Sequence, residues 1–156
     1  MRNVITLSVA AASAGLIGIM GAAPAGADAA SAGYGSPQSV TDVDVVTSYT
    51  VWQPQPSSDV INVPIVGKLY ESKVLVAAVE GAATPSIPFF NARSGNDNYR
   101  VLWQAYAPNG LSGATLPQGA NASGKIYFDV TGAAPTSVVY NDAVQDRLRW
   151  GGSSAS

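Results

Sequence analysis

The residues that most enzymes use for nucleophilic or metal chemistry are missing from this sequence. It contains no His and no Cys in 156 residues. A Ser-His-Asp or Cys-His nucleophile therefore has no base, and neither imidazole nor thiolate can bind zinc. Carboxylates, Lys, Tyr and oxygen ligands for hard cations remain. The composition thus argues against zinc enzymes and thiol redox proteins.

The acidic residues are few and no spacing groups them convincingly. A glycoside hydrolase needs two carboxyl groups about 5–9 Å apart across a cleft, one with a raised pKa. Asp42 and Asp44 are two residues apart, so in a strand they would share one face and could supply half of a calcium or glycosidase site. A solvated outer face, with Val43 and Val45 turned inward, explains them better. The other candidate acids are Glu71, Glu80, Asp97, Asp129, Asp142 and Asp146.

One stretch imitates a phosphate-binding loop. GANASGKI (119–126) has two glycines and a lysine at the spacing that the phosphate-binding motif requires. However, Ile126 stands where the motif requires Ser or Thr to bind magnesium. The following residues predict a strand, whereas the motif requires a helix. We interpret Lys125 as an exposed charge at the start of a strand. The sequence thus assigns no catalytic, cofactor-binding or metal-binding residue, and we expect no cofactor.

The N-terminus predicts export. Arg2 precedes an uncharged apolar run, Val4–Met20, and small residues follow at Ala25 and Ala27. This order is typical of a secretory signal peptide over residues 1–27. The alternative is a retained membrane anchor, but the run is rich in Ala, Gly and Ser. We expect a secreted, extracellular protein without a stable membrane anchor after processing.

The remaining chain suits one domain. Residues 28–39 and 151–156 are rich in small and polar residues, so we interpret them as a flexible leader and a disordered tail around a domain at 40–150. The net charge is -2, without a basic stripe, so nucleic acid is not an expected partner. Because the chain has no Cys, the domain must be stabilised by burial alone.

The sequence of the domain predicts a series of short strands separated by turns. Period-2 alternation and frequent β-branched residues favour strands, and the longest run, 68–79, has a helix as its alternative. Pro64 marks an edge or bulged strand, and SGND (94–97) is typical of a hairpin loop. The pattern predicts an all-β antiparallel sandwich or barrel. The predicted strands are 40–52, 59–67, 68–79, 87–93, 98–106, 124–130, 136–141 and 144–150.

Two Trp residues are predicted to face the core. In the strand 98–106 the alternate residues from Tyr99 to Ala105 form an apolar face. This face includes Trp103, which we expect to be a core anchor, since a buried Trp hides about 200 Å². The alternative for Trp103 is an aromatic residue that stacks on a ligand. Leu148 and Trp150 alternate with arginines in the same way.

Three stretches resemble a known family. They are FFNARSGNDNYRVLWQ (89–104), LSGATLPQG (111–119) and GKIYFDVTGAAPT (124–136). In these strings the chain is similar to the small secreted mycobacterial antigens of the MPT/MPB-sixty-three family, densely over 90–136 and more loosely over 40–150. The resemblance implies an immunoglobulin-like β-sandwich and an immunogenic protein of unassigned role. It transfers no catalytic residue.

Together these features favour a secreted, non-catalytic binding or interaction protein, expected to be a monomer. Its partners would be host or envelope proteins or glycans, contacted through loop aromatics such as Tyr34, Tyr106 and Tyr140. One alternative is a carboxylate-dependent hydrolase of envelope glycans. Another is a lipid or small-ligand carrier, which would need an internal cavity of several hundred Å³.

Overall fold

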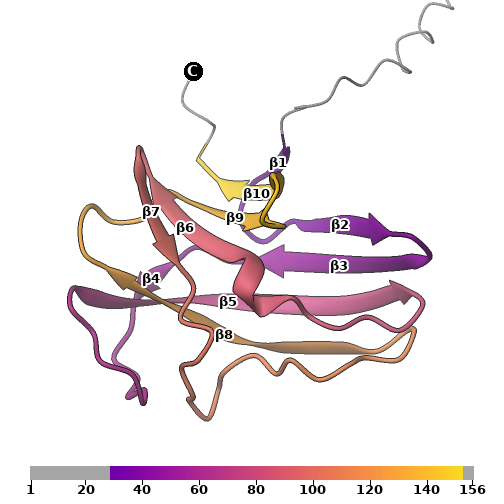
Figure 1. Ribbon diagram of the computed structural model, residues 1–156, viewed down its shortest axis with the longest axis horizontal. Helices are drawn as coiled ribbons and strands as arrows, with labels where there is room; N and C mark the ends of the chain where they lie inside the picture. Colours follow the sequence, from indigo (N-terminus) through magenta and orange to yellow (C-terminus); the bar gives the residue numbers. More distant parts are fainter. Residues whose placement is uncertain (1–28, 153–156) are drawn as a thin grey trace, which may run out of the picture.

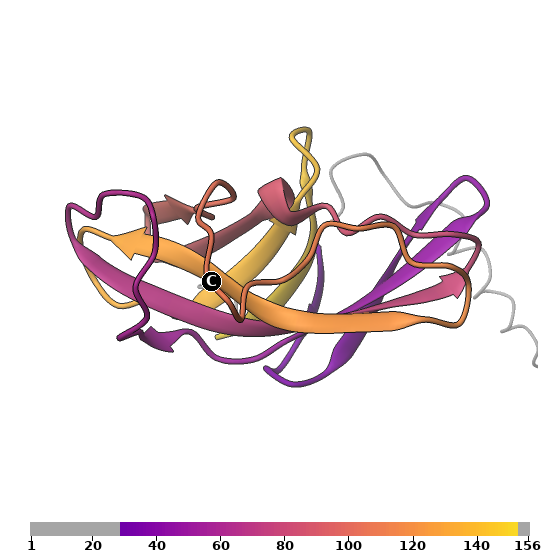
Figure 2. The ribbon, with the colours of Figure 1, turned by 90° about the horizontal axis from the view of Figure 1, so that it is seen from below.

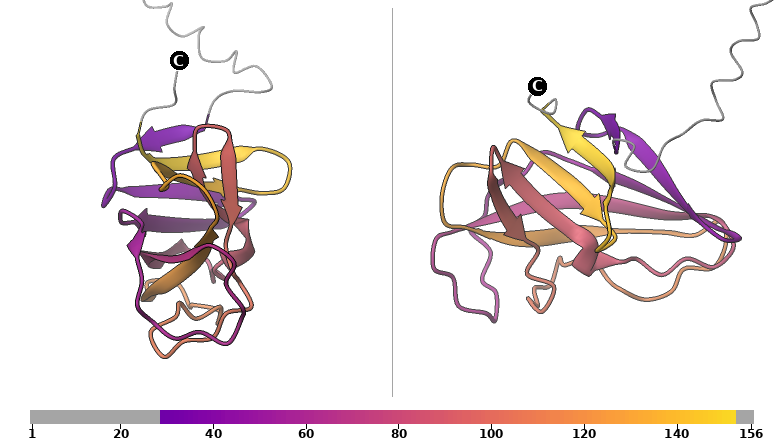
Figure 3. Two further views of the ribbon diagram at one scale, coloured as in Figure 1. Left: turned by 90° about the vertical axis from the view of Figure 1, so that its left-hand side faces the viewer. Right: turned by 45° about the horizontal axis from the view of Figure 1, so that its top comes forward.

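The structure is a computed structural model that describes residues 29–152. Two five-stranded sheets pack against each other as a β-sandwich, and their strands cross at an angle (Figures 1 and 3). The described part of the chain has no helix long and apolar enough to cross a membrane. The predicted signal peptide, residues 1–27, lies outside the described residues, as do residues 153–156 of the predicted tail.

The predicted all-β sandwich is confirmed. Sheet A has the strand order β1-β10-β9-β6-β7, and sheet B has the order β2-β3-β5-β4, with β8 also paired to β5. Only the pairing of β1 with β10 is parallel among these strands. Sheet A consists of β1 (Ala30–Ala32), β10 (Asp146–Gly151), β9 (Ser137–Asn141), β6 (Phe90–Ser94) and β7 (Asp97–Arg100). Sheet B consists of β2 (Pro37–Asp42), β3 (Val45–Val51), β5 (Lys68–Glu80), β4 (Gln55–Pro56) and β8 (Asn121–Val130).

The two longest strands, β5 and β8, run side by side across the molecule (Figures 1 and 2). The segment for which a helix was the alternative is therefore a strand, as its period-2 pattern predicts. Val74 and Val76 are completely buried between the sheets. Glu71 and Lys73, one residue out of phase, lie on the outer face of sheet B.

Aromatic side chains from both sheets fill the core. Tyr49 of β3 packs edge-on against Phe90 of β6, with ring centroids 5.5 Å apart. Trp150 of β10 is completely buried, and its indole Nε1 donates a hydrogen bond to the carbonyl oxygen of Ser36 over 2.8 Å. The predicted burial of Leu148 and Trp150 is thus confirmed, and the hydrogen bond ties β10 to the turn before β2.

The N-terminal part of the domain differs from the sequence interpretation. Residues 29–39, expected to belong to a flexible leader, contain β1 and the start of β2, and β1 pairs with β10. The expected single strand at 40–52 is a hairpin, because Asp42 pairs with Val45 across Val43 and Asp44. The alternation of Val with Asp42 and Asp44 fits a single strand with one polar face, so this pattern concealed the turn although Asp is a common turn residue.

Two predicted strands are shorter or absent. Residues 59–67 form a loop, and the short strand β4 precedes it. The predicted strand 98–106 ends at Arg100, where the chain leaves sheet A. The Val101 N–H donates to the Phe90 carbonyl of β6 (3.2 Å), whereas the Leu102 N–H donates to the Tyr127 carbonyl of β8 (2.8 Å).

Trp103 is consequently not a core anchor, and that prediction is wrong. Its side chain is 56% exposed, on a turn closed by a hydrogen bond from the Ala105 N–H to the Leu102 carbonyl (2.9 Å). Tyr99 and Val101 are buried as predicted, since they precede the change of sheet. The β6–β7 hairpin over SGND, residues 94–97, is also confirmed.

The two tryptophans therefore predict opposite responses to truncation. Trp150→Ala should lower the free energy of unfolding by about 3–5 kcal/mol, because it leaves a cavity between the sheets. Trp103→Ala should change it by less than about 0.5 kcal/mol, since the ring is on the surface. Urea unfolding of both variants measures the difference. Similar losses in the two variants would contradict the assignment of the core.

The β2–β3 turn predicts a stabilising substitution. Val43 has a φ of 57°, a left-handed conformation that is strained for a β-branched residue. Its side chain is 93% exposed, so little packing would be lost on removal. Val43→Gly should raise the free energy of unfolding by about 0.5–1 kcal/mol.

Val144→Gly is the matched control, because Val144 is 88% exposed without a positive φ. It should lower stability slightly through the added backbone entropy of the unfolded chain. Equal effects of the two substitutions in urea unfolding would count against the strain at Val43.

Candidate functional site

Five polar side chains form a network on the outer face of sheet B. The ammonium group of Lys125 lies 2.9 Å from Asp59 Oδ2 and 3.0 Å from Glu71 Oε1. The Tyr127 hydroxyl donates to the same Asp59 oxygen over 2.7 Å. Ser57 donates its hydroxyl hydrogen bond to Glu71. One lysine thus bridges two carboxylates, and each carboxylate also accepts a hydroxyl hydrogen bond.

The strands and one loop place these groups together. Glu71 pairs with Tyr127 across β5 and β8, and Lys125 lies two residues before Tyr127 on the same face. Asp59 belongs to the loop that joins β4 to β5, which packs over this face. Tyr127 points outward from the sheet, yet it is only 2% exposed. The loop therefore covers the tyrosine and brings an acid to the lysine.

The network holds Asp59, Lys125 and Tyr127 in their ordinary charge states. Hydrogen bonds from Lys125 and then Tyr127 lower the pKa of Asp59. Hydrogen bonds to Asp59 and Glu71 raise the pKa of Lys125, and burial followed by the bond to Asp59 raises the pKa of Tyr127. At neutral pH this lysine stays protonated and this tyrosine stays neutral. Neither is prepared to act as a base or a nucleophile.

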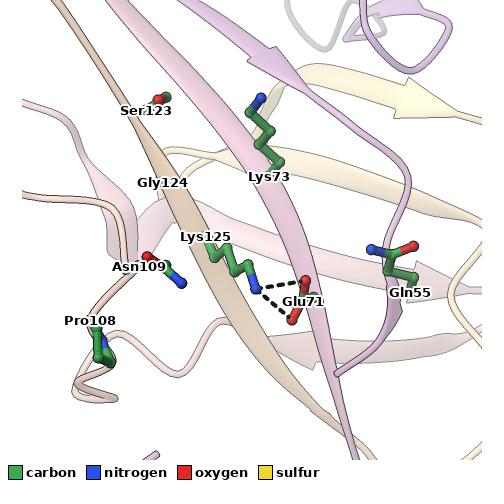
Figure 4. A pocket seen from close by; sticks show the side chains of 9 residues that line it. Gln55, Glu71, Lys73, Pro108, Asn109, Ser123, Gly124 and Lys125 are labelled. Carbon is green, nitrogen blue, oxygen red and sulfur yellow. Dashed lines mark hydrogen bonds and ion pairs between the residues drawn. The ribbon is translucent and has the colours of Figure 1, made fainter. Parts of the chain in front are cut away.

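A hollow of about 510 Å³ opens beside the network (Figure 4). Glu71 and Lys125 lie on its wall with their charged groups in contact, and the Lys73 side chain points away from them. Lys73 is directly opposite Lys125 in the ladder, so the two ammonium groups would repel each other if both extended toward the centre of the hollow. Instead, the Lys73 ammonium lies 5.1 Å from the ring centroid of Trp52.

A second loop, residues 102–112, forms the opposite wall of the hollow. Its Pro108, Asn109 and Gly110 line the hollow, and it lies on the same side of the molecule as the loop after β4 (Figure 1). Trp103 and Tyr106 on this loop are 56% and 74% exposed. The alternative role given to Trp103, that of a surface aromatic available to a ligand, therefore agrees with its position.

The structure explains why residues 119–126 share glycine and lysine positions with a phosphate-binding loop. Gly124 lies where the loop chain approaches β8, and a Cβ atom there would come within 2.5 Å of the Leu111 Cα. Lys125 N–H and carbonyl pair with Asn109 and Leu111 in that approach, at 2.8 and 2.9 Å. The glycine thus permits close backbone packing. Lys125 is half-buried in an ion-pair network and is not the exposed strand-start charge that the sequence predicts.

The predicted candidate acids do not gather at one site. Asp146 pairs with Arg93 on sheet A, Asp142 pairs with Arg147, and Asp129 accepts backbone N–H groups of the loop after β4. Glu80, Asp97 and Asp44 are exposed, and Asp42 pairs with Arg147 over 3.4 Å. Among residues 29–152 no group of three or more Asp, Glu, His or Cys could hold a metal ion.

The three tyrosines predicted to be exposed loop residues differ in their burial. Tyr106 is exposed, whereas Tyr140 belongs to β9 and is buried, which corrects its prediction as a loop residue. Tyr34 is half-buried beside the core, and burial raises its pKa to about 12. The sequence did not single out Asp59 or Tyr127, because only the long β4–β5 loop brings Asp59 to residues far along the chain.

Comparison with known proteins identifies the family. Residues 29–150 match the family described as a domain of unknown function (DUF1942). The chain belongs to this family. It is 45% identical over 120 residues to immunogenic protein MPB63 of Mycobacterium bovis, covering 74% of this chain and 76% of that protein. The same figures apply to immunogenic protein MPT63 of Mycobacterium tuberculosis.

The solved structure of MPT63, described as a secreted protein from Mycobacterium tuberculosis, has the same fold. It superposes with a TM-score of 0.77 at 42% sequence identity, covering 81% of this chain and 99% of that one. The resemblance to the MPT/MPB-sixty-three antigens is thus confirmed. The relatives are named for immunogenicity, and their names state no catalysed reaction.

The Lys125 network predicts a pH-dependent loss of stability. Asp59 has a lowered pKa in the folded protein, so its charge stabilises the fold above the ordinary pKa near 4. This stabilisation is lost as the pH falls through the lowered value. Asp59→Asn should lower the free energy of unfolding by about 1 kcal/mol at neutral pH, and the difference from wild type should shrink as the pH falls below the ordinary pKa near 4.

The measurement is urea unfolding at neutral and acidic pH, with Asp42→Asn as the control. The Asp42 side chain is 66% exposed and its ion pair is longer, so its removal should matter little. If Asp59→Asn and wild type showed the same pH dependence, the network would not contribute as described.

Proposed function

We propose that this protein is a secreted, non-catalytic binding protein that contacts its partner through loop 102–112 and the adjoining 510 Å³ hollow. The observation that carries the proposal is the joint exposure of Trp103 and Tyr106 on one loop. Trp and Tyr are enriched among the residues that dominate binding energy at protein interfaces. Host or envelope proteins and glycans are the partner classes that such a surface suits.

The loop is held in place before any partner arrives. Its Leu102 and Leu111 N–H groups bond to carbonyls of β8, at 2.8 and 2.9 Å. The Tyr106 N–H donates to Asn62 Oδ1 over 2.6 Å, which joins the loop to the one after β4. A surface that is already ordered loses little conformational entropy on binding. This bracing supports a recognition role for the aromatic side chains.

The shape beside the loop suits a partner that lies along the surface. A further hollow of about 310 Å³ is lined by residues from Ala105 to Ser112 and shares Pro108 and Gly110 with the larger one. The two hollows therefore adjoin. Between the sheets, by contrast, the fully buried side chains of Val74, Phe128 and Trp150 occupy the core. This arrangement favours surface recognition over carriage of a lipid inside the sandwich.

The charge states favour binding over hydrolysis. A glycan hydrolase needs a carboxyl group whose pKa is raised so that it can donate a proton near neutral pH. The pKa of Asp59 is lowered instead, and its partner Lys125 remains charged. Secretion is supported by the predicted signal peptide and by the description of the related MPT63 as a secreted protein.

Removal of the two aromatic side chains tests the proposal. The protein is immobilised, and separated protein and glycan fractions of mycobacterial envelope and of host cells are passed over it. Binding of the active fraction should be at least about tenfold weaker for the double variant Trp103→Ala, Tyr106→Ala. Val144→Ala, which removes an even more exposed apolar side chain from the β9–β10 turn, should bind like wild type.

The result also separates the partner classes. If a protease-treated fraction still binds the immobilised protein, the partner is a glycan. If protease treatment abolishes binding, the partner is a protein. Equal binding by the double variant and wild type would overturn the assignment of loop 102–112 as the contact surface.

A further inference from the structure

We propose that the outer face of sheet A binds an acidic saccharide, a sugar ring bearing a carboxylate, at a site separate from loop 102–112. A hollow of about 360 Å³ lies there, over β6, β7 and the turn after β9. Its size is within the range of small-ligand sites. Its wall carries three carboxamides and two guanidinium groups, and none of the residues that line it is acidic.

Two carboxamides bond to each other, and the third, Asn141, is linked to them through Asp146 and Arg93. Asn98 donates to Asn91 Oδ1 over 3.1 Å, and Asn91 donates to the Phe89 carbonyl over 3.3 Å. Asn98 in turn accepts from Arg93 Nε over 2.8 Å. Asn141 donates to Asp146 over 2.6 Å. The three amide orientations are therefore fixed before a ligand binds, which is the condition for a specific polar site.

Each amide retains capacity for a ligand. A carboxamide has two N–H donors and an oxygen with two acceptor sites, and each of these NH₂ groups uses one donor in the bonds given above. A donor beside an acceptor matches the neighbouring hydroxyl groups of a sugar ring, which both donate and accept. Phe89 and Pro88 supply an apolar edge to the same hollow, against which the C–H face of a ring could pack.

The charge of this face selects an anion. The four arginines of the described chain, Arg93, Arg100, Arg147 and Arg149, lie on the strands of sheet A. Arg93 is neutralised by Asp146, and Arg147 by Asp142 and Asp42. Arg100 and Arg149 have no ion pair within residues 29–152, and of these two only Arg100 lines the hollow, where it stands directly opposite Asn91 in the ladder. One uncompensated guanidinium thus lies beside the amides.

These features together favour an acidic sugar over other anions. A guanidinium binds a carboxylate with two parallel hydrogen bonds, and the amides and the apolar edge would contact the ring. Nucleic acid is disfavoured, because the chain has a net charge of -2 and this face offers no continuous basic stripe. Inorganic phosphate would use the arginine and leave the amides without a partner.

The test is a titration of each probe into the protein, monitored by ¹H–¹⁵N NMR spectra of the protein. D-glucuronate is the probe, D-glucose is its neutral counterpart, and inorganic phosphate is the anion without a ring. Saturable shifts of the side-chain NH₂ signals of Asn91, Asn98 and Asn141 are expected with glucuronate. Shifts with glucose or phosphate should be much weaker. Arg100→Gln should weaken glucuronate binding by about tenfold.

Arg100 suits this purpose because it is exposed and forms no ion pair in the described chain, so its replacement should leave the fold intact. Lys73→Gln removes a cation from the opposite outer face and should bind glucuronate like wild type. Absence of saturable shifts, or equal binding of glucose, would overturn the proposal. Equal binding of phosphate would also overturn it, because a general anion site needs no sugar. Intact binding by the double variant Trp103→Ala, Tyr106→Ala would show that the two sites are independent.

Discussion

The antiparallel pairing of β5 with β8 is the interaction on which the other features depend. Ten residue pairs align in one register, from Lys68 with Val130 to Ala77 with Asn121. A slip of one residue would turn Glu71 and Lys73 toward the core and expose the buried Val74 and Val76. The register therefore fixes the apolar interior and the polar outer face together. A domain without disulfides gains its stability from that apolar interior.

The same register creates an electrostatic conflict that shapes the outer face. Lys73 and Lys125 are directly opposed, and each is drawn to a different partner. Lys73 lies over the ring of Trp52, while Lys125 bridges Asp59 and Glu71. The loop after β4 is thereby held to the sheet, and it in turn contacts loop 102–112. The ion-pair network thus helps to position the aromatic surface proposed for binding, which gives the network a structural role.

The two outer faces of the sandwich offer different chemistry. Sheet B presents lysines and carboxylates beside the loop that carries two exposed aromatic residues, whereas sheet A presents arginines and three carboxamides. A sandwich fold by itself assigns no function, and function depends on the groups at particular sites. The related MPT63 structure shares the fold, and the contrast between the faces of this chain underlies the two separate recognition surfaces that we propose for it.

The sequence by itself determined the strand character of the chain, the inward face of β5 and β10, and the absence of His and Cys chemistry, because these follow from residue type and period-2 alternation. It could not determine where the chain turns or changes sheet. Trp103 fits an inward strand position by alternation, yet it is exposed because β7 ends at Arg100 and the chain crosses to β8. The meeting of Asp59 with Lys125 was likewise decided by tertiary structure alone, since loop closure joins residues that no local pattern relates.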